Sequence, residues 1–256
     1  MVKPSPRQWT PYEQTQLARY GRRPEVIVTA DIPVEYVTGI AEFAGRPFLV
    51  TPATLIPRIE TEQLVELVVN DISSSYPTAE RLSIIEVGTG CGAIGVTLSW
   101  ELRRRGWAHR LVVSDVSTKA LAVARLNFGR LAATAPVTFV VSDLLGTIKA
   151  DLQADVIVAN LPYIPTARLA SLSSSVTGYE PAQALDGGSD GARLIRRLVA
   201  QAPSHLKPKG RVWLEIDHTH RPADLRTNRG DYQLDIFEDS ANLPRFARLQ
   251  PTRPRC

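Results

Sequence analysis

Five short apolar segments recur along most of this chain of 256 residues, and they are rich in the β-branched residues that favour buried strands. They cover residues 82–87, 111–113, 137–141, 156–159 and 212–216. Segments with apolar residues at helical spacing separate several of these strands. Such alternation of strands and helices predicts a doubly wound α/β fold, with a mostly parallel sheet and helices on both faces.

Further elements are expected at the two ends of the chain. Residues 231–237 and 246–249 resemble two strands, which would complete a seven-stranded sheet as antiparallel members. A Gly-Arg pair at 45–46 separates two apolar stretches, which favours a hairpin, and a helix-like segment follows it. We therefore expect a small N-terminal appendage with a hairpin and a helix at residues 1–75, and the α/β domain at residues 76–256.

Composition and charge restrict the class of protein. No apolar run approaches the roughly 20 residues that cross a bilayer, and the N-terminus lacks the apolar core of a signal peptide. The two cysteines, Cys91 and Cys256, are not expected to form a disulfide, which fits a reducing compartment. The four histidines form no cluster with cysteines, so no metal site is expected.

The net charge of +4 is too mild to favour nucleic-acid binding, although it does not exclude it. We expect a cytoplasmic monomer that does not bind membranes.

A glycine-rich loop follows the first predicted strand. Its glycines let the backbone bend sharply and approach a ligand closely, and a helix is expected directly after it. Gly90, Gly92 and Gly95 also match the spacing of dinucleotide-binding loops. The loop alone therefore leaves open an NAD-type dehydrogenase or a non-catalytic nucleotide-binding module.

Three acidic residues stand at the carboxyl ends of successive predicted strands. Glu86 would repel a pyrophosphate and suits a cationic ligand instead. Asp115 is placed to accept hydrogen bonds from both hydroxyls of a ribose. Asp143 could accept from an adenine amino group, with Leu144 packing against the ring. S-adenosylmethionine has an adenosine, no phosphate and a sulfonium cation, and it therefore fits these residues better than a dinucleotide does.

The segment Asn160, Leu161, Pro162 and Tyr163 follows the fourth predicted strand, at the sheet edge where open α/β folds bind ligands. The side-chain oxygen of Asn160 and the backbone carbonyl of Leu161 can each accept a hydrogen bond. Pro162 stiffens the loop, and the ring of Tyr163 can pack against a flat group. These residues predict a clamp for a planar NH2 group, the simpler interpretation being a strand-ending turn with a proline.

Four ordered motifs resemble those of the HemK/PrmC family of S-adenosylmethionine-dependent protein-(glutamine) methyltransferases. They are Leu-Ile-Pro-Arg-Ile-Glu-Thr-Glu at 55–62, Glu-Val-Gly-Thr-Gly-Cys-Gly at 86–92, Asn-Leu-Pro-Tyr-Ile at 160–164 and Glu-Pro-x-x-Ala-Leu-x-Gly-Gly-x-Asp-Gly at 180–191. The family methylates the side-chain amide nitrogen of glutamine in the Gly-Gly-Gln tripeptide of class I peptide-chain release factors. The resemblance implies the class I methyltransferase fold, S-adenosylmethionine as the cofactor and a release factor as the protein substrate.

The resemblance also implies a role for particular residues. The methionine part of the cofactor would be lined by Gly88, Thr89, Gly90, Cys91 and Gly92. Asp115 would hold the ribose, and Asp143 with Leu144 would hold the adenine. Asn160 through Tyr163 would hold the acceptor glutamine, and Asn160 would also border the cofactor.

The chain departs from the family pattern at several places. Leu161 replaces the first proline of Asn-Pro-Pro-Tyr, Ile59 replaces the proline of Arg-Pro-Glu-Thr-Glu, and Asp217 stands where the family has glycine. Leucine keeps the backbone carbonyl, so we expect the chemistry to survive with a looser loop. Fewer than 40 residues precede the expected hairpin, too few for the helical N-terminal domain with which the family grips a release factor.

The four residues at 160–163 also leave a second acceptor open. Asn-Leu-Pro-Tyr occurs in adenine dimethyltransferases that act on ribosomal RNA, and an adenine amino group would fit the same clamp. The alternative is therefore an adenine amino methyltransferase acting on RNA or DNA, which should have a strongly basic groove.

Overall fold

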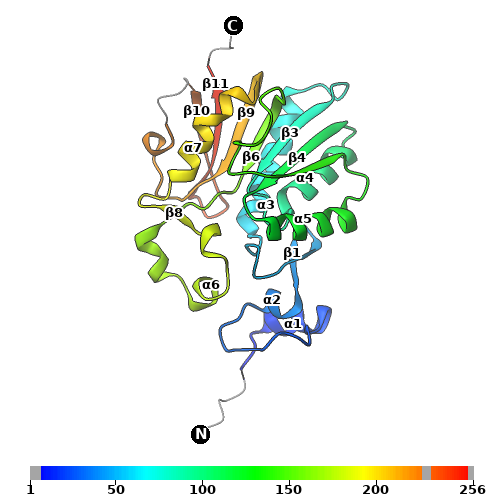
Figure 1. Cartoon of the computed structure of the whole chain (residues 1–256), viewed down its shortest axis with the longest axis vertical. Coiled ribbons are helices and arrows are strands. Elements are labelled where there is room, and N and C mark those ends of the chain that lie inside the picture. The colour runs from blue at the N-terminus through cyan, green and yellow to red at the C-terminus, as the bar shows by residue number, and fades with distance from the viewer. Residues whose placement is uncertain (1–6, 227–231, 253–256) are drawn as a thin grey trace.

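The central element of the computed structural model is a seven-stranded sheet (Figure 1). The structure describes residues 7–226 and 232–252. The strands are β3 Leu82–Val87, β4 His109–Asp115, β5 Val137–Val141, β6 Ala154–Ala159, β9 Leu206–Glu215, β10 Tyr232–Glu238 and β11 Pro244–Pro251. They lie in the order β10-β11-β9-β6-β3-β4-β5, and only β11 pairs antiparallel with its neighbours. The predicted mostly parallel, seven-stranded sheet is confirmed; residue 231, the predicted start of a strand, lies outside the described residues.

Two clusters of buried apolar residues lie on opposite faces of this sheet. The helices that contribute to one cluster are α3 Ile59–Ser75, α4 Ala93–Arg104 and α5 Thr118–Leu131, and α7 Arg193–Gln201 contributes to the other. Because side chains alternate along a strand, Ile84 of β3 belongs to the first cluster and Ile85 to the second. Helices therefore cover both faces, as the alternation in the sequence predicts.

The N-terminal part consists of α1 Pro11–Tyr20, α2 Val34–Thr38 and the expected hairpin of β1 Ile40–Phe43 and β2 Arg46–Leu49. The turn residues Ala44 and Gly45 both have positive φ, which matches the right-handed twist of the two strands. Phe43 and Phe48 of the hairpin are buried in the same cluster as Ile84 of the sheet. Residues before and after the expected boundary at 75–76 thus share one apolar core. The division into two domains at that boundary stays a prediction.

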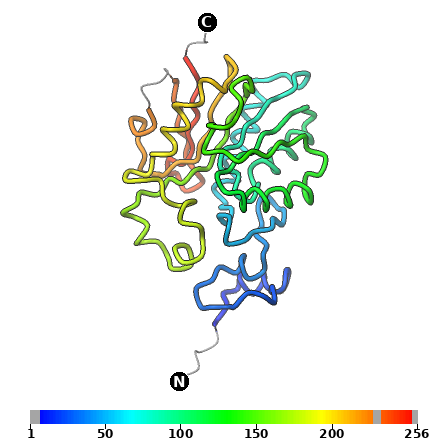
Figure 2. The backbone as a smooth tube through the Cα atoms, in the orientation of Figure 1, coloured from blue at the N-terminus to red at the C-terminus, as the bar shows by residue number. Residues whose placement is uncertain are grey.

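A long connection follows β6 and runs beyond the carboxyl edge of the sheet (Figure 2). It contains β7 Ile164–Pro165, η1 Thr166–Ser171, α6 Ser174–Thr177, η2 Ala182–Ala184 and β8 Asp186–Gly188. β7 and β8 pair in parallel, so the two ends of the connection are held together. The remaining short elements are η3 Ala202–Ser204 and η4 Pro222–Leu225.

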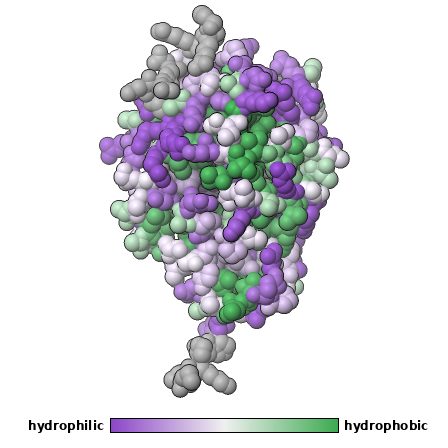
Figure 3. All heavy atoms as spheres, in the orientation of Figure 1, coloured by the Kyte–Doolittle hydropathy of each residue, from purple (hydrophilic) through white to green (hydrophobic). Residues whose placement is uncertain are grey.

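The surface is mixed in character on the face that Figure 3 presents, where hydrophilic and hydrophobic residues are interspersed. Within the described residues, no helix has the length and apolar character that crossing a membrane requires. Cys91 is buried with a free thiol, and Cys256 lies outside the described residues.

Candidate functional site

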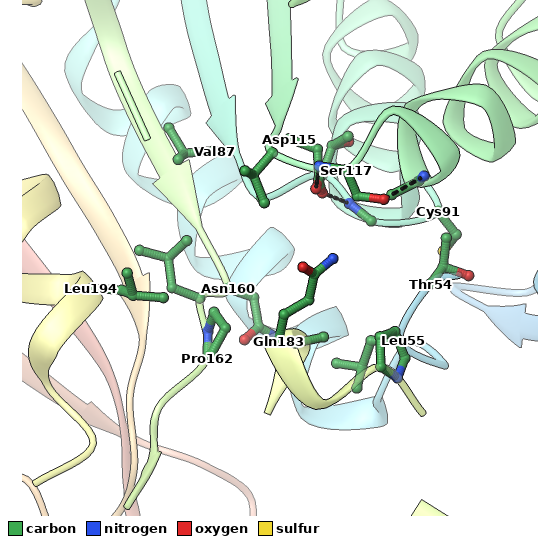
Figure 4. Close-up of a pocket in the computed structure, with 18 of the residues that line it drawn as sticks. Thr54, Leu55, Val87, Cys91, Asp115, Ser117, Asn160, Pro162, Gln183 and Leu194 are labelled. Atoms are coloured by element: carbon green, nitrogen blue, oxygen red, sulfur yellow. Dashed lines mark hydrogen bonds between the residues drawn. The ribbon is translucent and has the colours of Figure 1, made fainter. Parts of the chain in front are cut away.

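A cavity of about 520 Å³ opens beyond the carboxyl ends of β3, β4, β5 and β6. This is where ligands bind in open α/β sheets, and the volume is in the range of small-molecule sites. The predicted site residues that line it are Gly88, Thr89, Gly90, Cys91, Asp115, Asp143, Leu144, Asn160, Leu161 and Pro162. Figure 4 shows several of them arranged around the open space. Gly92 and Tyr163 are not among the lining residues.

The glycine loop turns sharply between β3 and α4. Gly88, Gly90 and Gly92 have φ values of 74°, 54° and 87°, which residues with a side chain rarely adopt. A methyl group on Gly90 would meet no atom within 4 Å, whereas one on Gly92 would lie 3.3 Å from Ala124 Cβ on α5. Gly90 thus presents bare backbone, while Gly92 permits close packing between the loop and α5.

Asp115 connects this loop to the end of β4. Gly90 N donates to its Oδ2 and Ser117 N to its Oδ1, each at 2.9 Å. Burial raises the pKa of Asp115, and these backbone hydrogen bonds partly offset the rise. Each carboxylate oxygen retains a lone pair, so Asp115 can still accept from the two hydroxyls of a ribose.

Asp143 and Leu144 form a rim of the cavity next to α7. The Asp143 carboxylate pairs with Arg197 Nη2 at 2.7 Å, and its side chain is 60% exposed. Leu144 is buried and has a φ of 55°. The apolar side chain of Leu144 therefore faces the cavity from a fixed turn, while the carboxylate of Asp143 lies at the solvent boundary.

Glu86 is placed differently from the sequence-based expectation. It is fully buried and does not line the cavity, because it shares the face of β3 with Ile84 and lies beneath α4. Its carboxyl oxygens make no well-formed hydrogen bond to a described residue. Burial raises its pKa to about 8, against smaller opposing contributions from Thr89 and Gly95. The prediction that Glu86 faces a cationic ligand is wrong, because its neighbour Val87 lines the cavity and Glu86 does not.

The loop after β6 is held from behind by a chain of hydrogen bonds. Asn160 Nδ2 donates to Thr61 Oγ1 at 3.0 Å, and Thr61 Oγ1 donates to Glu215 Oε2 at 2.7 Å. The Tyr163 hydroxyl donates to the other oxygen, Oε1, of Glu215 at 2.9 Å. Tyr163 thus lies behind the loop rather than in the lining of the cavity, and its packing against an acceptor group stays a prediction.

Most of the chain is similar in sequence to known release factor glutamine methyltransferases. It is 41% identical over 213 residues to the release factor glutamine methyltransferase of Koribacter versatilis, covering 83% of this chain and 72% of that protein. The protein of the same name from Moorella thermoacetica is 40% identical over 219 residues, with 84% and 74% covered. The one from Bacillus subtilis is 38% identical over 207 residues, with 80% and 69% covered. The chain belongs to the release factor glutamine methyltransferase family.

Other comparisons agree with this membership. Residues 64–171 match the family model described as the methyltransferase small domain. Ribosomal protein L11 methylase from Lactobacillus delbrueckii subsp. bulgaricus superposes with a TM-score of 0.52 at 20% identity, over 80% of this chain and 84% of that one. A methyltransferase from Pyrococcus furiosus gives 0.54 at 17% identity, over 81% and 89%. These two structures confirm the class I methyltransferase fold.

Membership of a release factor glutamine methyltransferase family implies S-adenosylmethionine as the cofactor, and the cavity fits it. Bare backbone at Gly90 and the carboxylate of Asp115 suit an uncharged nucleoside with an amino-acid tail. Arg58 and Arg193 supply the cations among the described lining residues, and Arg58 is paired with Glu180. A dinucleotide-binding loop holds its pyrophosphate through backbone N–H groups at a helix N-terminus, so this charge does not decide against a dehydrogenase. Membership of the methyltransferase family does.

The family motifs also contain site residues whose role is not predictable from sequence patterns. Arg58 Nη2 donates to Glu180 Oε1 at 2.5 Å across 122 positions of sequence. Glu180 is buried, so this pair fixes the segment before α3 against the connection after β6. Figure 4 shows Gln183 reaching into the cavity from η2. Sequence order alone could not bring these two segments together, although both carry recognisable motifs.

The structure shows the contacts made by two residues that depart from the family pattern, Leu161 and Asp217. Leu161 is 4% exposed and packs into the apolar cluster around Ile85. Asp217 accepts a hydrogen bond from Arg168 Nη1 at 3.1 Å and others from Thr219. Burial alone would raise the pKa of Asp217, but these bonds outweigh it and lower the pKa to about 2. Asp217 thereby anchors η1, whose Leu169 lines the cavity.

Proposed function

We propose that this chain transfers the methyl group of S-adenosylmethionine to the side-chain amide nitrogen of the Gly-Gly-Gln glutamine in a class I peptide-chain release factor. The observation that carries the proposal is the position of Asn160 and Leu161 in the wall of one cavity with the glycine loop. The names of the related proteins support the choice of substrate.

The acceptor nitrogen is held by two oxygens in this proposal. The Asn160 side chain and the Leu161 carbonyl each accept one N–H of the glutamine amide, which fixes the nitrogen for in-line attack. When bound, S-adenosylmethionine supplies an electrophilic methyl group on a positively charged sulfur. The nitrogen gains that methyl group as the bond from methyl to sulfur breaks, which leaves a neutral thioether, and the nitrogen then loses one proton to solvent. The two oxygens stabilise the positive charge that grows on nitrogen during transfer.

The cofactor residues take their places around the same cavity. We assign the ribose to Asp115, the adenine to Leu144 with Asp143 at the rim, and the methionine part to the loop at 88–92. Cys91 takes part through its position only, because burial raises the pKa of its thiol to about 12 and keeps it protonated.

Location, oligomeric state and domain arrangement belong to the same proposal. We propose a cytoplasmic monomer in which residues 1–75 form an appendage to the methyltransferase domain at 76–256. The segment between β2 and α3 borders the acceptor side of the cavity through Thr54 and Arg58, and the first turn of α3 does so through Thr61. These parts of the appendage are placed to meet the protein substrate.

Adenine in RNA or DNA is the competing acceptor. The described lining of the cavity contains two arginines and three aspartates, Asp115, Asp143 and Asp186, rather than the basic surface that a nucleic acid needs. The charge at the site therefore favours a protein acceptor.

The test is methyl transfer from labelled S-adenosylmethionine to a purified class I release factor. The same factor with its Gly-Gly-Gln glutamine replaced by alanine and bulk ribosomal RNA serve as parallel acceptors. We expect label in the unmodified factor only. Label in RNA alone would overturn the proposal, and so would equal labelling of the alanine variant.

A further inference from the structure

We propose that Thr61 and Glu215 are positioning residues that orient the Asn160 side chain, so that its amide oxygen rather than its NH2 group faces the acceptor glutamine. This inference rests on the proposed function, because it explains how the proposed clamp acquires its hydrogen-bonding polarity. Neither residue was assigned a role by sequence reasoning.

An asparagine side chain can adopt two orientations that differ in hydrogen bonding. Its side-chain amide has an acceptor and a donor end of nearly the same size and shape, and rotation by half a turn exchanges them. Only the oxygen end can hold the N–H of a glutamine amide. An Asn160 free to rotate would therefore present the wrong end for part of the time.

The hydrogen bonds behind the loop remove this freedom. An ionised Glu215 only accepts hydrogen bonds, so the single hydroxyl hydrogen of Thr61 is committed to Oε2 at 2.7 Å. Thr61 Oγ1 can then only accept from Asn160, and the atom 3.0 Å away must be the donor, Nδ2. The oxygen of Asn160 is left to accept from the substrate.

Glu215 is itself fixed on the side away from Thr61. The Tyr163 hydroxyl donates to Oε1 at 2.9 Å, so both carboxylate oxygens are engaged. Thr61 and Glu215 are only 4% and 1% exposed, so water has little access to these bonds. Tyr163 therefore contributes to the clamp by holding Glu215.

The same network gives the orientation a dependence on pH. A proton on Oε2 would let Glu215 donate to Thr61, Thr61 would donate in turn to Asn160, and Asn160 would have to turn its oxygen away from the substrate. Burial raises the pKa of Glu215, opposed by the bonds from Thr61 and Tyr163. Arg245 on β11, which is paired with Asp239, favours the ionised form, and Glu60 on α3 disfavours it. We expect turnover to fall as pH drops through the pKa of Glu215.

The first experiment compares Thr61→Val with Thr61→Ser. Valine has nearly the shape of threonine without the hydroxyl, whereas serine keeps it. We expect Thr61→Val to lower kcat on the release factor about tenfold, the scale of one lost hydrogen bond, with the Kd of S-adenosylmethionine unchanged. Serine should restore kcat.

Thr97→Val is the matched control, since Thr97 is equally buried but lies on α4 away from this cavity. Thr61→Ala replaces the valine variant if the latter does not fold.

A double variant separates positioning from general damage. Because Asn160→Ala is expected to leave no turnover to measure, the comparison uses the free energy of unfolding. If Thr61 acts through Asn160, then Thr61→Val should destabilise the Asn160→Ala variant less than it destabilises the wild type. An equal loss in both backgrounds would overturn the inference, and so would wild-type turnover of Thr61→Val.

A second readout does not depend on the substrate. The Asn160 side-chain NH2 group can be followed by hydrogen exchange in the NMR spectrum of the full chain, where its signals are those missing from Asn160→Ala. We expect slow exchange in the wild type and in Thr97→Val, and faster exchange in Thr61→Val. Unchanged exchange in Thr61→Val would overturn the inference even if release factor is methylated. Faster exchange without any methylation of release factor would retain the orientation and reject the proposed substrate.

Discussion

The backbone of Gly88 lies directly against the side chain of Leu161, so closely that a methyl group on Gly88 would come within 3.1 Å of Leu161 Cδ2. The same methyl group would lie 3.7 Å from the carbonyl oxygen of Asn160. The loop assigned to the cofactor and the loop assigned to the acceptor are therefore in contact. This contact places the proposed methyl donor and the proposed acceptor next to each other.

Replacing Gly88 by alanine tests this contact. The φ of 74° at Gly88 strains any residue with a side chain, by about 1–2 kcal/mol, and the added methyl group also presses on Leu161. We expect Gly88→Ala to weaken cofactor binding and to lower the free energy of unfolding, as measured by calorimetry and by denaturant titration.

Gly129→Ala provides the control for Gly88→Ala. Gly129 lies inside α5, and a methyl group there meets no atom within 4 Å. Alanine should raise the free energy of unfolding by up to about 1 kcal/mol, because it is the better helix former. Equal effects of the two substitutions would contradict the account of Gly88.

Asp115 should matter more for cofactor binding than Asp143. Asp115→Ala removes two hydrogen bonds within the loop as well as the proposed ribose contact, and we expect cofactor binding to weaken by about 1–3 kcal/mol. Asp143→Ala should have a smaller effect, because that carboxylate lies at the solvent boundary with Arg197. Titration calorimetry with S-adenosylmethionine measures both. An unchanged Kd in Asp115→Ala would rule out the ribose assignment.

The burial of Glu86 predicts a dependence of stability on pH. The pKa of Glu86 is raised from 4.5 to about 8 in the folded protein. Between these values the folded state keeps a proton that the unfolded chain has released, so the Glu86 contribution makes the protein less stable as pH rises. Glu86→Gln removes this contribution. We expect the stability of this variant relative to the wild type to increase from pH 5 to pH 8, measured by denaturant unfolding; a constant difference would contradict the raised pKa.

Much of the fold follows from local features of the sequence. The β-branched segments, the Gly-Arg hairpin turn and the glycine loop are each visible in a few consecutive residues, and they place Asp115 and Asn160 at one sheet edge. What could not be predicted depends on which face of a strand a residue occupies or on contacts between distant segments. Of the consecutive residues Glu86 and Val87, Glu86 faces α4 and Val87 faces the cavity, and the pairing of Arg58 with Glu180 requires the assembled fold.

For Asn160, too, the position is predictable from the local sequence and the contacts with distant segments are not. Its place at the end of β6 is predictable from the apolar run before it. The orientation of its amide is set by Thr61 and Glu215, which come from α3 and β9 and have no local relation to the loop. Sequence patterns therefore predict the proposed clamp but not the residues that orient it.

The most direct measurement of the central claim is mass spectrometry of a class I release factor after incubation with S-adenosylmethionine and either the wild type or Asn160→Ala. The account predicts one methyl group on the glutamine of the Gly-Gly-Gln peptide with the wild type. It predicts none with Asn160→Ala, while calorimetry shows that this variant still binds the cofactor. Near-normal methylation by Asn160→Ala would contradict the clamp, and a methyl group on any other residue would contradict the proposed acceptor.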